Sequence, residues 1–215
     1  MNSSEVAPAV RANAYQVLAR AFAPPATWND SLGPELRAHL GLWGGRVAYL
    51  ASQAADEADR IKNDLDGAAI AHAKLFLGPF EIDAPPYASI YLDPKQRLMG
   101  EVARFVAEFY AEAGLEPGPG PRELPDHIAL ELEFMYFLAF QEAEAPPSNH
   151  AWFHRQRSFW LEHLGRWLPE FARKLISTDR HPFYVSLGRL LEEVAAAQTA
   201  FFQGDSATNS GGLPI

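Results

Sequence analysis

Imidazole and carboxylate side chains gather in one stretch of the sequence, Pro125–Leu138 (PDHIALELEFMYFL). His127 and Glu131 are four residues apart, a spacing that puts both on one face of a helix, where they could bind a metal or transfer protons. Glu131 and Glu133 are about 200° apart on a helix, so we do not expect them to act as an acid–base pair. A buried carboxylate here should bond to loop amides or a neighbouring helix start; the alternative is that it receives a ligand's positive charge.

A second pair of histidines, His150 and His154, has a spacing that can place two imidazoles on one metal ion. Several motifs that would support chemistry are missing: the sequence has no Glu-x-x-His pair, no His-Glu-x-x-His, no Gly-x-Ser-x-Gly, no phosphate-binding glycine loop and no cysteine. We therefore expect no metal and no cofactor. A small helical enzyme or metal protein that uses His127 with Glu131, or His150 with His154, stays open as the alternative.

The elements that would position these residues are helices, because the apolar residues recur at helical spacing and hardly ever alternate. The central helix should begin with Pro125 and Asp126 in its first turn, and its apolar residues cover most of its circumference, which is typical of the middle of a bundle. The prediction is an all-α fold of about eight helices in a single domain over 1–203, followed by a flexible tail over 204–215. A proline–glycine run at 116–121 could be a hinge between two lobes. The other expected helices run from Ser4 to Pro24, after Pro34, and over about 47–64, 65–77, 100–113, 149–165, 168–177 and 182–203.

Between two of these helices, Pro79–Pro94 is too rich in proline for a helix interior, yet it carries Phe80, Tyr87 and Tyr91. We predict an ordered loop that its aromatic side chains hold in place. Together with the acidic entrance of the central helix, this loop would form an apolar groove with a negatively charged rim. Such a groove suits a peptide that is both cationic and hydrophobic.

The charge of the chain agrees with a cationic partner. The formal net charge is −9, and residues 101–150 alone contribute 2 − 10 = −8. An acidic field repels nucleic acid and anionic lipid, so neither is an expected partner. No apolar run approaches the roughly 18 residues of a membrane span, and Met1–Val10 lacks the pattern of a signal peptide. We expect a protein of the cytoplasm that does not insert into membranes.

In the proline-rich loop and the central helix the sequence resembles the TorD/DmsD family of redox-enzyme maturation chaperones, whose NarJ-type members are more distant. The likeness extends from Tyr15 to about Phe202, and the proline–aromatic loop combined with the Pro-Asp-His helix start is its specific part. The matching segments are His72-x-x-Leu75-Phe76-x-Gly78-Pro79, Pro85–Asp93, Phe109-Tyr110 with Gly114, Pro125–His127 running into Leu130–Met135, Phe159-x-x-x-His163-Leu164-x-x-Trp167-x-Pro169-x-Phe171, and Phe183-Tyr184.

The resemblance implies an all-helical fold without catalysis, and a partner that is the twin-arginine leader or another part of a molybdenum enzyme. Family members hold this client in the cytoplasm until its molybdopterin cofactor is inserted. Tyr87 stands where several relatives have tryptophan, which bears on leader preference. The resemblance also implies a monomer or a dimer formed by exchange of halves at the 116–121 hinge. Carried over by position, the recognition residues are Leu75, Phe76, Pro86, Tyr87, Asp126 and His127, with Glu123 nearby.

Overall fold

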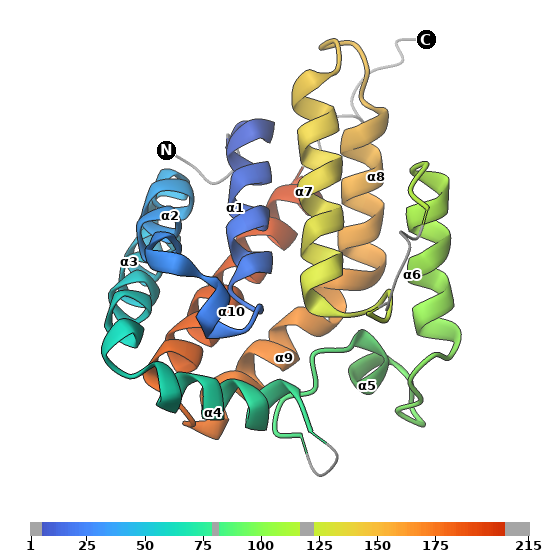
Figure 1. The fold of residues 1–215 in the computed structure, drawn as a ribbon. Coiled ribbons are helices and arrows are strands. Elements are labelled where there is room, and N and C mark those ends of the chain that lie inside the picture. Colours follow the sequence, from blue (N-terminus) through green and yellow to red (C-terminus); the bar gives the residue numbers. More distant parts are fainter. Residues whose placement is uncertain (1–5, 79–81, 117–122, 205–215) are drawn as a thin grey trace, which may run out of the picture.

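A computed structural model describes residues 6–78, 82–116 and 123–204, and they form an all-α fold, as predicted (Figure 1). The helices of these residues are α1 (Pro8–Arg20), α2 (Leu32–Leu40), α3 (Gly45–Arg60), α4 (Leu65–Phe76), α5 (Ala88–Leu92), α6 (Glu101–Glu112), α7 (Ile128–Glu144), α8 (Ala151–Phe159), α9 (Gly165–Thr178) and α10 (Pro182–Gly204). Short 3₁₀ turns join several of them, namely η2 (Pro25–Thr27), η3 (Asn29–Ser31), η4 (Gly41–Trp43) and η5 (Ile61–Asn63), and a π-helical turn, η6 (Trp160–Leu164), joins α8 to α9.

The central helix is α7, but it begins later than the sequence predicts. His127 is its N-cap and Ile128 its first residue, so Pro125 and Asp126 precede the helix instead of forming its first turn. Its apolar faces are buried as expected, with Ile128, Leu132 and Met135 almost inaccessible to solvent. In Figure 1, α7 stands between α1 and α8. The helix therefore occupies the middle of the bundle, and its N-terminus meets the segment around α5.

The proline-rich segment differs from the prediction in one respect. Residues Ala88–Leu92 form the short helix α5, because the prolines that forbid a helix end at Pro86 and the next one is Pro94. The aromatic anchoring is as expected for Tyr91, whose ring stacks on that of Trp167 with centroids 5.4 Å apart and whose hydroxyl donates to the carbonyl of Pro85. Phe80 lies outside the described residues.

Helix α6 packs against the rest of the bundle through aromatic rings. Phe109 meets Phe159 of α8, and Tyr110 meets Phe134 of α7 while its hydroxyl donates to the carbonyl of Pro125 at 2.8 Å. The helix follows α5 along the chain and lies to the right of α8 in Figure 1.

Three predicted features lie outside the described residues. They are the 116–121 hinge except for residue 116, the 204–215 tail beyond Gly204, and the expected cap Ser4. The two-lobe division and the exchange of halves therefore stay predictions.

Candidate peptide-binding site

The segment before α5 and the segment before α7 are joined by a short antiparallel bridge between Tyr87 and His127. The amide of Ala88 donates to the carbonyl of Asp126 at 2.9 Å, and the amide of Ile128 donates to the carbonyl of Pro86 at 2.8 Å. Two stretches about forty residues apart in the sequence are thus held in register, and Pro86, Tyr87, Asp126 and His127 come together at this bridge.

Asp126 does not contribute a charge to the rim of a groove, and in this respect the sequence-based expectation is wrong. Its side chain is fully buried, and its Oδ2 accepts hydrogen bonds from the hydroxyl and, at 2.9 Å, from the backbone amide of Ser89. A carboxylate that accepts a backbone amide at the start of a helix replaces the intrahelical partner that this amide lacks. Asp126 therefore fixes the first turn of α5 relative to α7.

The side chains that do reach the surface are those of Glu123, Tyr87 and His127. Glu123 is exposed, whereas Tyr87 and His127 are half-buried. The Tyr87 hydroxyl donates to Glu123 Oε1 at 3.0 Å, and its ring meets the His127 ring edge to face with centroids 5.2 Å apart. The three side chains form a small surface cluster with one carboxylate, one phenol and one imidazole.

Burial changes the titration of this cluster. It lowers the pKa of His127, against the opposing effects of Glu123 and Asp126, and it raises the pKa of Tyr87 to about 12 with a further contribution from Glu123. The Nδ1 atom of His127 accepts the amide of Ala129 at 3.2 Å, so this nitrogen is unprotonated when it caps α7. Burial thus disfavours a positive charge on the His127 imidazole, and Glu123 is the carboxylate that the cluster offers to a partner.

Leu75 and Phe76 lie in the core, so they do not line a surface groove as the carried-over roles imply. Leu75 is fully buried, and the Phe76 ring packs against Phe22 and Tyr184 with centroids 5.7 and 5.4 Å away. The backbone nevertheless links them to the site, because the Leu75 carbonyl accepts the amide of Ala84 at 3.1 Å. Their role in the structure is to anchor the proline-rich segment on α4.

Glu131 has a different set of partners from those expected. It is fully buried, its Oε1 lies 2.7 Å from His163 Nε2, and its Oε2 accepts the indole NH of Trp167 at 3.0 Å. Burial raises its pKa, and the interactions with His163 and Trp167 oppose the shift. The predicted loop amides are thus replaced by two side chains from η6 and α9, and Glu133 on the opposite side of α7 is exposed.

Glu131 and His127, the first pair in the metal or enzyme alternative, have separate partners. Glu131 is engaged away from His127, whose Nδ1 caps the helix, and His150 and His154 are both exposed at the start of α8. In the part of the chain that the structure describes, no group of three or more histidine, cysteine, aspartate or glutamate side chains is arranged to hold a metal ion.

Sequence reasoning missed Ser89 and Trp167 as supports of the site. Ser89 holds Asp126, and Trp167 holds both Glu131 and Tyr91. The position of Ser89 two residues after the bridging Tyr87 was a usable signal, since serine near a helix start often bonds to nearby polar groups. Trp167 gave no local signal, because its partners come from distant parts of the chain.

Within the described residues, no helix is both long enough and apolar enough to cross a membrane. Residues 34–173 match the family model of the nitrate reductase delta subunit. Chaperone protein TorD of Vibrio vulnificus is 31% identical over 174 residues, which cover 80% of this chain and 75% of the relative. Chaperone protein TorD of Vibrio parahaemolyticus is 30% identical over 134 residues, which span 61% of this chain and 62% of that relative.

A further curated relative and a solved structure are also similar to this chain. The Tat proofreading chaperone DmsD of Salmonella typhi is 28% identical over 117 residues, or 54% of this chain and 53% of the relative. A crystal structure from Archaeoglobus fulgidus, described as that of a candidate redox enzyme maturation protein, matches the fold with a TM-score of 0.52 and 19% identity, over 86% of this chain and 93% of that one. The chain therefore belongs to the TorD/DmsD family of redox-enzyme maturation chaperones.

Proposed function

We propose that this protein is a cytoplasmic chaperone for a molybdopterin-dependent oxidoreductase of the dimethyl sulfoxide reductase family. It binds the twin-arginine leader of the client, the rest of the apoprotein, or both, and keeps the client from export until the cofactor is inserted. The names of the relatives support the chaperone role, since they include TorD chaperones and a Tat proofreading chaperone. The protein itself performs no chemical transformation in this proposal.

The observation that carries the leader-binding part is the cluster of Glu123, Tyr87 and His127 on a rigid support. Glu123 is exposed and offers a carboxylate to a guanidinium, while the two rings beside it offer an apolar and aromatic surface. The bridge and the buried Asp126–Ser89 contact hold these side chains in place before a peptide arrives. A preformed site avoids part of the entropy cost of binding.

Typical interaction free energies indicate how much the cluster can contribute to the affinity for the leader. An exposed ion pair is worth about 0–1 kcal/mol, so the contact of Glu123 with an arginine cannot supply most of the affinity. The apolar segment that follows the arginines in such leaders must supply the greater part. The carboxylate then acts mainly on the orientation of the peptide and on the association rate.

A test uses a fluorescent synthetic peptide with two consecutive arginines followed by an apolar segment of about ten residues. The double variant Glu123→Gln with His127→Asn removes the charge and the imidazole, and asparagine at position 127 can still cap α7. We expect the dissociation constant to rise between about twofold and tenfold. Fluorescence anisotropy measures it.

The matched control is Glu144→Gln, because Glu144 is also exposed and lies at the other end of α7, about 25 Å away by the helical rise. This control should bind as the wild-type protein does. An unchanged dissociation constant in the double variant would remove Glu123 and His127 from the site, and a wild-type protein that binds no such leader would overturn the leader-binding proposal itself.

A further inference from the structure

A groove separate from the Glu123–Tyr87–His127 cluster runs between α5, α6 and the π-helical turn η6. Its apolar lining comes from Leu92, Val102 and Phe105, and the buried His163 forms part of its wall. The volume is about 360 Å³. An apolar cavity of about 150 Å³ holds benzene, so this groove has room for more than one aliphatic or aromatic side chain.

Large apolar side chains are exposed along this edge of the molecule. Phe105 is 36% exposed, and Leu98 and Met99, which come just before α6, are 48% and 79% exposed. These three residues lie within 98–105, so the apolar exposure is concentrated in one segment. Concentrated apolar surface of this kind is typical of interaction sites.

Charged side chains of both signs line the groove beside the apolar ones. Arg104 and Arg166 stand against Glu101, Glu108 and Glu162, which gives the lining a formal charge of 2 − 3 = −1. Arg104 forms ion pairs with Glu101 and, at 3.9 Å, with Glu108. Because these charges nearly balance, the apolar side chains are what distinguishes this groove from the cluster around Glu123.

Helix α5 connects the two surfaces. Tyr87 is its N-cap, and Leu92, its last residue, lines the groove. A helix of five residues rises only about 7.5 Å, so a bound peptide that contacts the cluster needs only a few residues to reach the groove. In Figure 1, α5 lies between α9 and α6, which agrees with this placement.

On these grounds, and resting on the function proposed above, we propose that the groove between α5, α6 and η6 holds the apolar segment of the leader while the cluster of Glu123, Tyr87 and His127 holds its arginines. Along α5 the cluster comes first and the groove second, and along the leader the arginines come first and the apolar segment second. Most of the affinity then comes from the groove between α5, α6 and η6, since apolar burial there outweighs an exposed ion pair.

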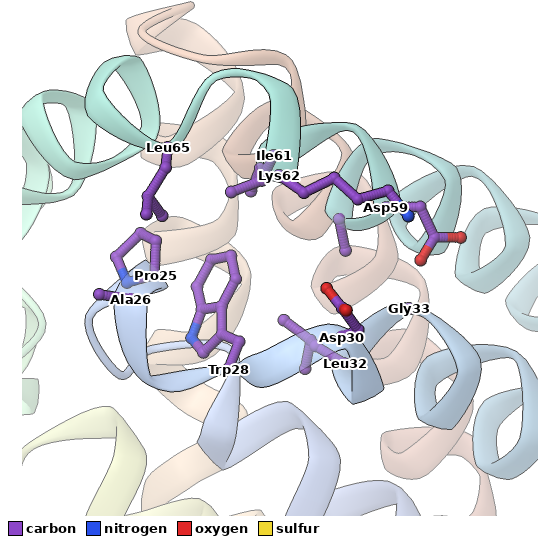
Figure 2. A pocket seen from close by; sticks show the side chains of 11 residues that line it. Pro25, Ala26, Trp28, Asp30, Leu32, Gly33, Asp59, Ile61, Lys62 and Leu65 are labelled. Carbon is purple, nitrogen blue, oxygen red and sulfur yellow. The ribbon is translucent and has the colours of Figure 1, made fainter.

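The structure has a second cleft, which provides an internal comparison. It lies among the N-terminal elements, and its lining includes the apolar Trp28, Ile61 and Leu65 and the charged Asp30, Asp59 and Lys62 (Figure 2). This cleft has no residue in common with α5, α6 or the Tyr87 bridge. A leader that bound there would not reach the cluster through α5.

The decisive variant is Phe105→Asp, with Phe140→Asp as the matched control. Both phenylalanines are partly exposed, at 36% and 44%, but Phe140 lies on α7 and does not line the groove. Each variant is titrated with the leader peptide and with a short peptide that keeps the arginines and lacks the apolar segment. Circular dichroism and thermal unfolding verify that both variants are folded.

We expect Phe105→Asp to weaken the binding of the full leader at least tenfold and to leave the short peptide unaffected, and Phe140→Asp to leave both unaffected. If the full leader binds the wild-type protein and Phe105→Asp equally well, the groove assignment is wrong and the proposed function stands. If the wild-type protein binds no leader, both proposals fail.

A photo-cross-linking experiment tests the same assignment without any substitution. A benzophenone side chain in the apolar segment of the leader should form adducts within 92–109 or 160–166, and mass spectrometry of the digested protein locates them. Adducts among residues 25–33 or 58–65 would instead place the apolar segment in the cleft of Figure 2 and overturn the proposal.

Discussion

Two buried carboxylates, Asp126 and Glu131, hold the site in shape, whereas the exposed Glu123 supplies its charge. The sequence analysis placed Glu123 and Asp126 at the rim of a groove and expected partners for a buried Glu131, and spacing alone could not tell that Asp126 would be buried as well. Asp126 is buried because Ser89 offers it two donors, and Glu131 because His163 and Trp167 offer it two more. The burial of a carboxylate requires such partners, and these come from other elements of the chain.

Acid should destabilise the protein through its histidines. Burial lowers the pKa values of His72 and His127 below the ordinary 6.5, so the unfolded chain binds protons more readily than the folded one when the pH falls below that value. The free energy of unfolding is then expected to be lower at pH 5.5 than at pH 7.5. Urea denaturation of the wild-type protein and of His127→Asn at both pH values measures the contribution of His127.

The variant should lose less stability on acidification than the wild-type protein, because asparagine does not titrate and still caps α7. Glu131 and Glu133, whose pKa values are raised by burial, act in the opposite direction as the pH approaches 4.5, but they are present in both proteins. Equal losses in the two proteins would show that His127 does not contribute.

At the scale of elements, most helices could be predicted, and two short ones could not. Helices α4 and α6 begin and end within about a residue of the expected positions, because Gly78 and Gly114 follow them and apolar spacing marks them. The short α5 and the π-helical turn η6 were missed. Each makes contacts with a distant part of the chain that local sequence does not mark, Ser89 with Asp126 in α5 and His163 with Glu131 in η6.

The packing of α9 against α10 depends on a glycine that the sequence does not mark. A Cβ atom at Gly188 would lie 2.8 Å from the carbonyl oxygen of Ala172 and 3.0 Å from the Cβ of Leu175. Gly188→Ala should therefore lower the free energy of unfolding by about 1–3 kcal/mol, since backbone on the facing helix must move. Urea denaturation at pH 7.5 measures the change.

Gly41→Ala is the control for this substitution. A Cβ atom at Gly41 meets no heavy atom within 4 Å, and the φ angle of −59° suits alanine. This variant should be neutral or more stable by up to about 1 kcal/mol. If Gly188→Ala were as stable as Gly41→Ala, α9 and α10 would not be packed as closely as the structure has them.

For the molecule as a whole, the sequence predicted the all-α fold, the family and the acidic character of the region around α7, because these depend on composition, period and motif. It did not locate the groove lined by Phe105, which requires α6, α5 and η6 to meet. Nor did it show that Leu75 and Phe76 are buried, because an apolar pair at the end of a helix can face either the core or a ligand.

The uneven charge of the chain leads to a prediction about binding kinetics. Residues 101–150 carry a formal charge of 2 − 10 = −8, and this segment includes both Glu123 and the α6 side of the groove. A leader with two arginines should therefore associate quickly at low ionic strength, and its association rate should fall several-fold between about 50 mM and about 500 mM salt. The dissociation rate should change much less, because apolar contacts in the groove resist screening. Stopped-flow fluorescence separates the two rates, and a salt effect confined to dissociation would contradict the division of roles between the charged cluster and the groove.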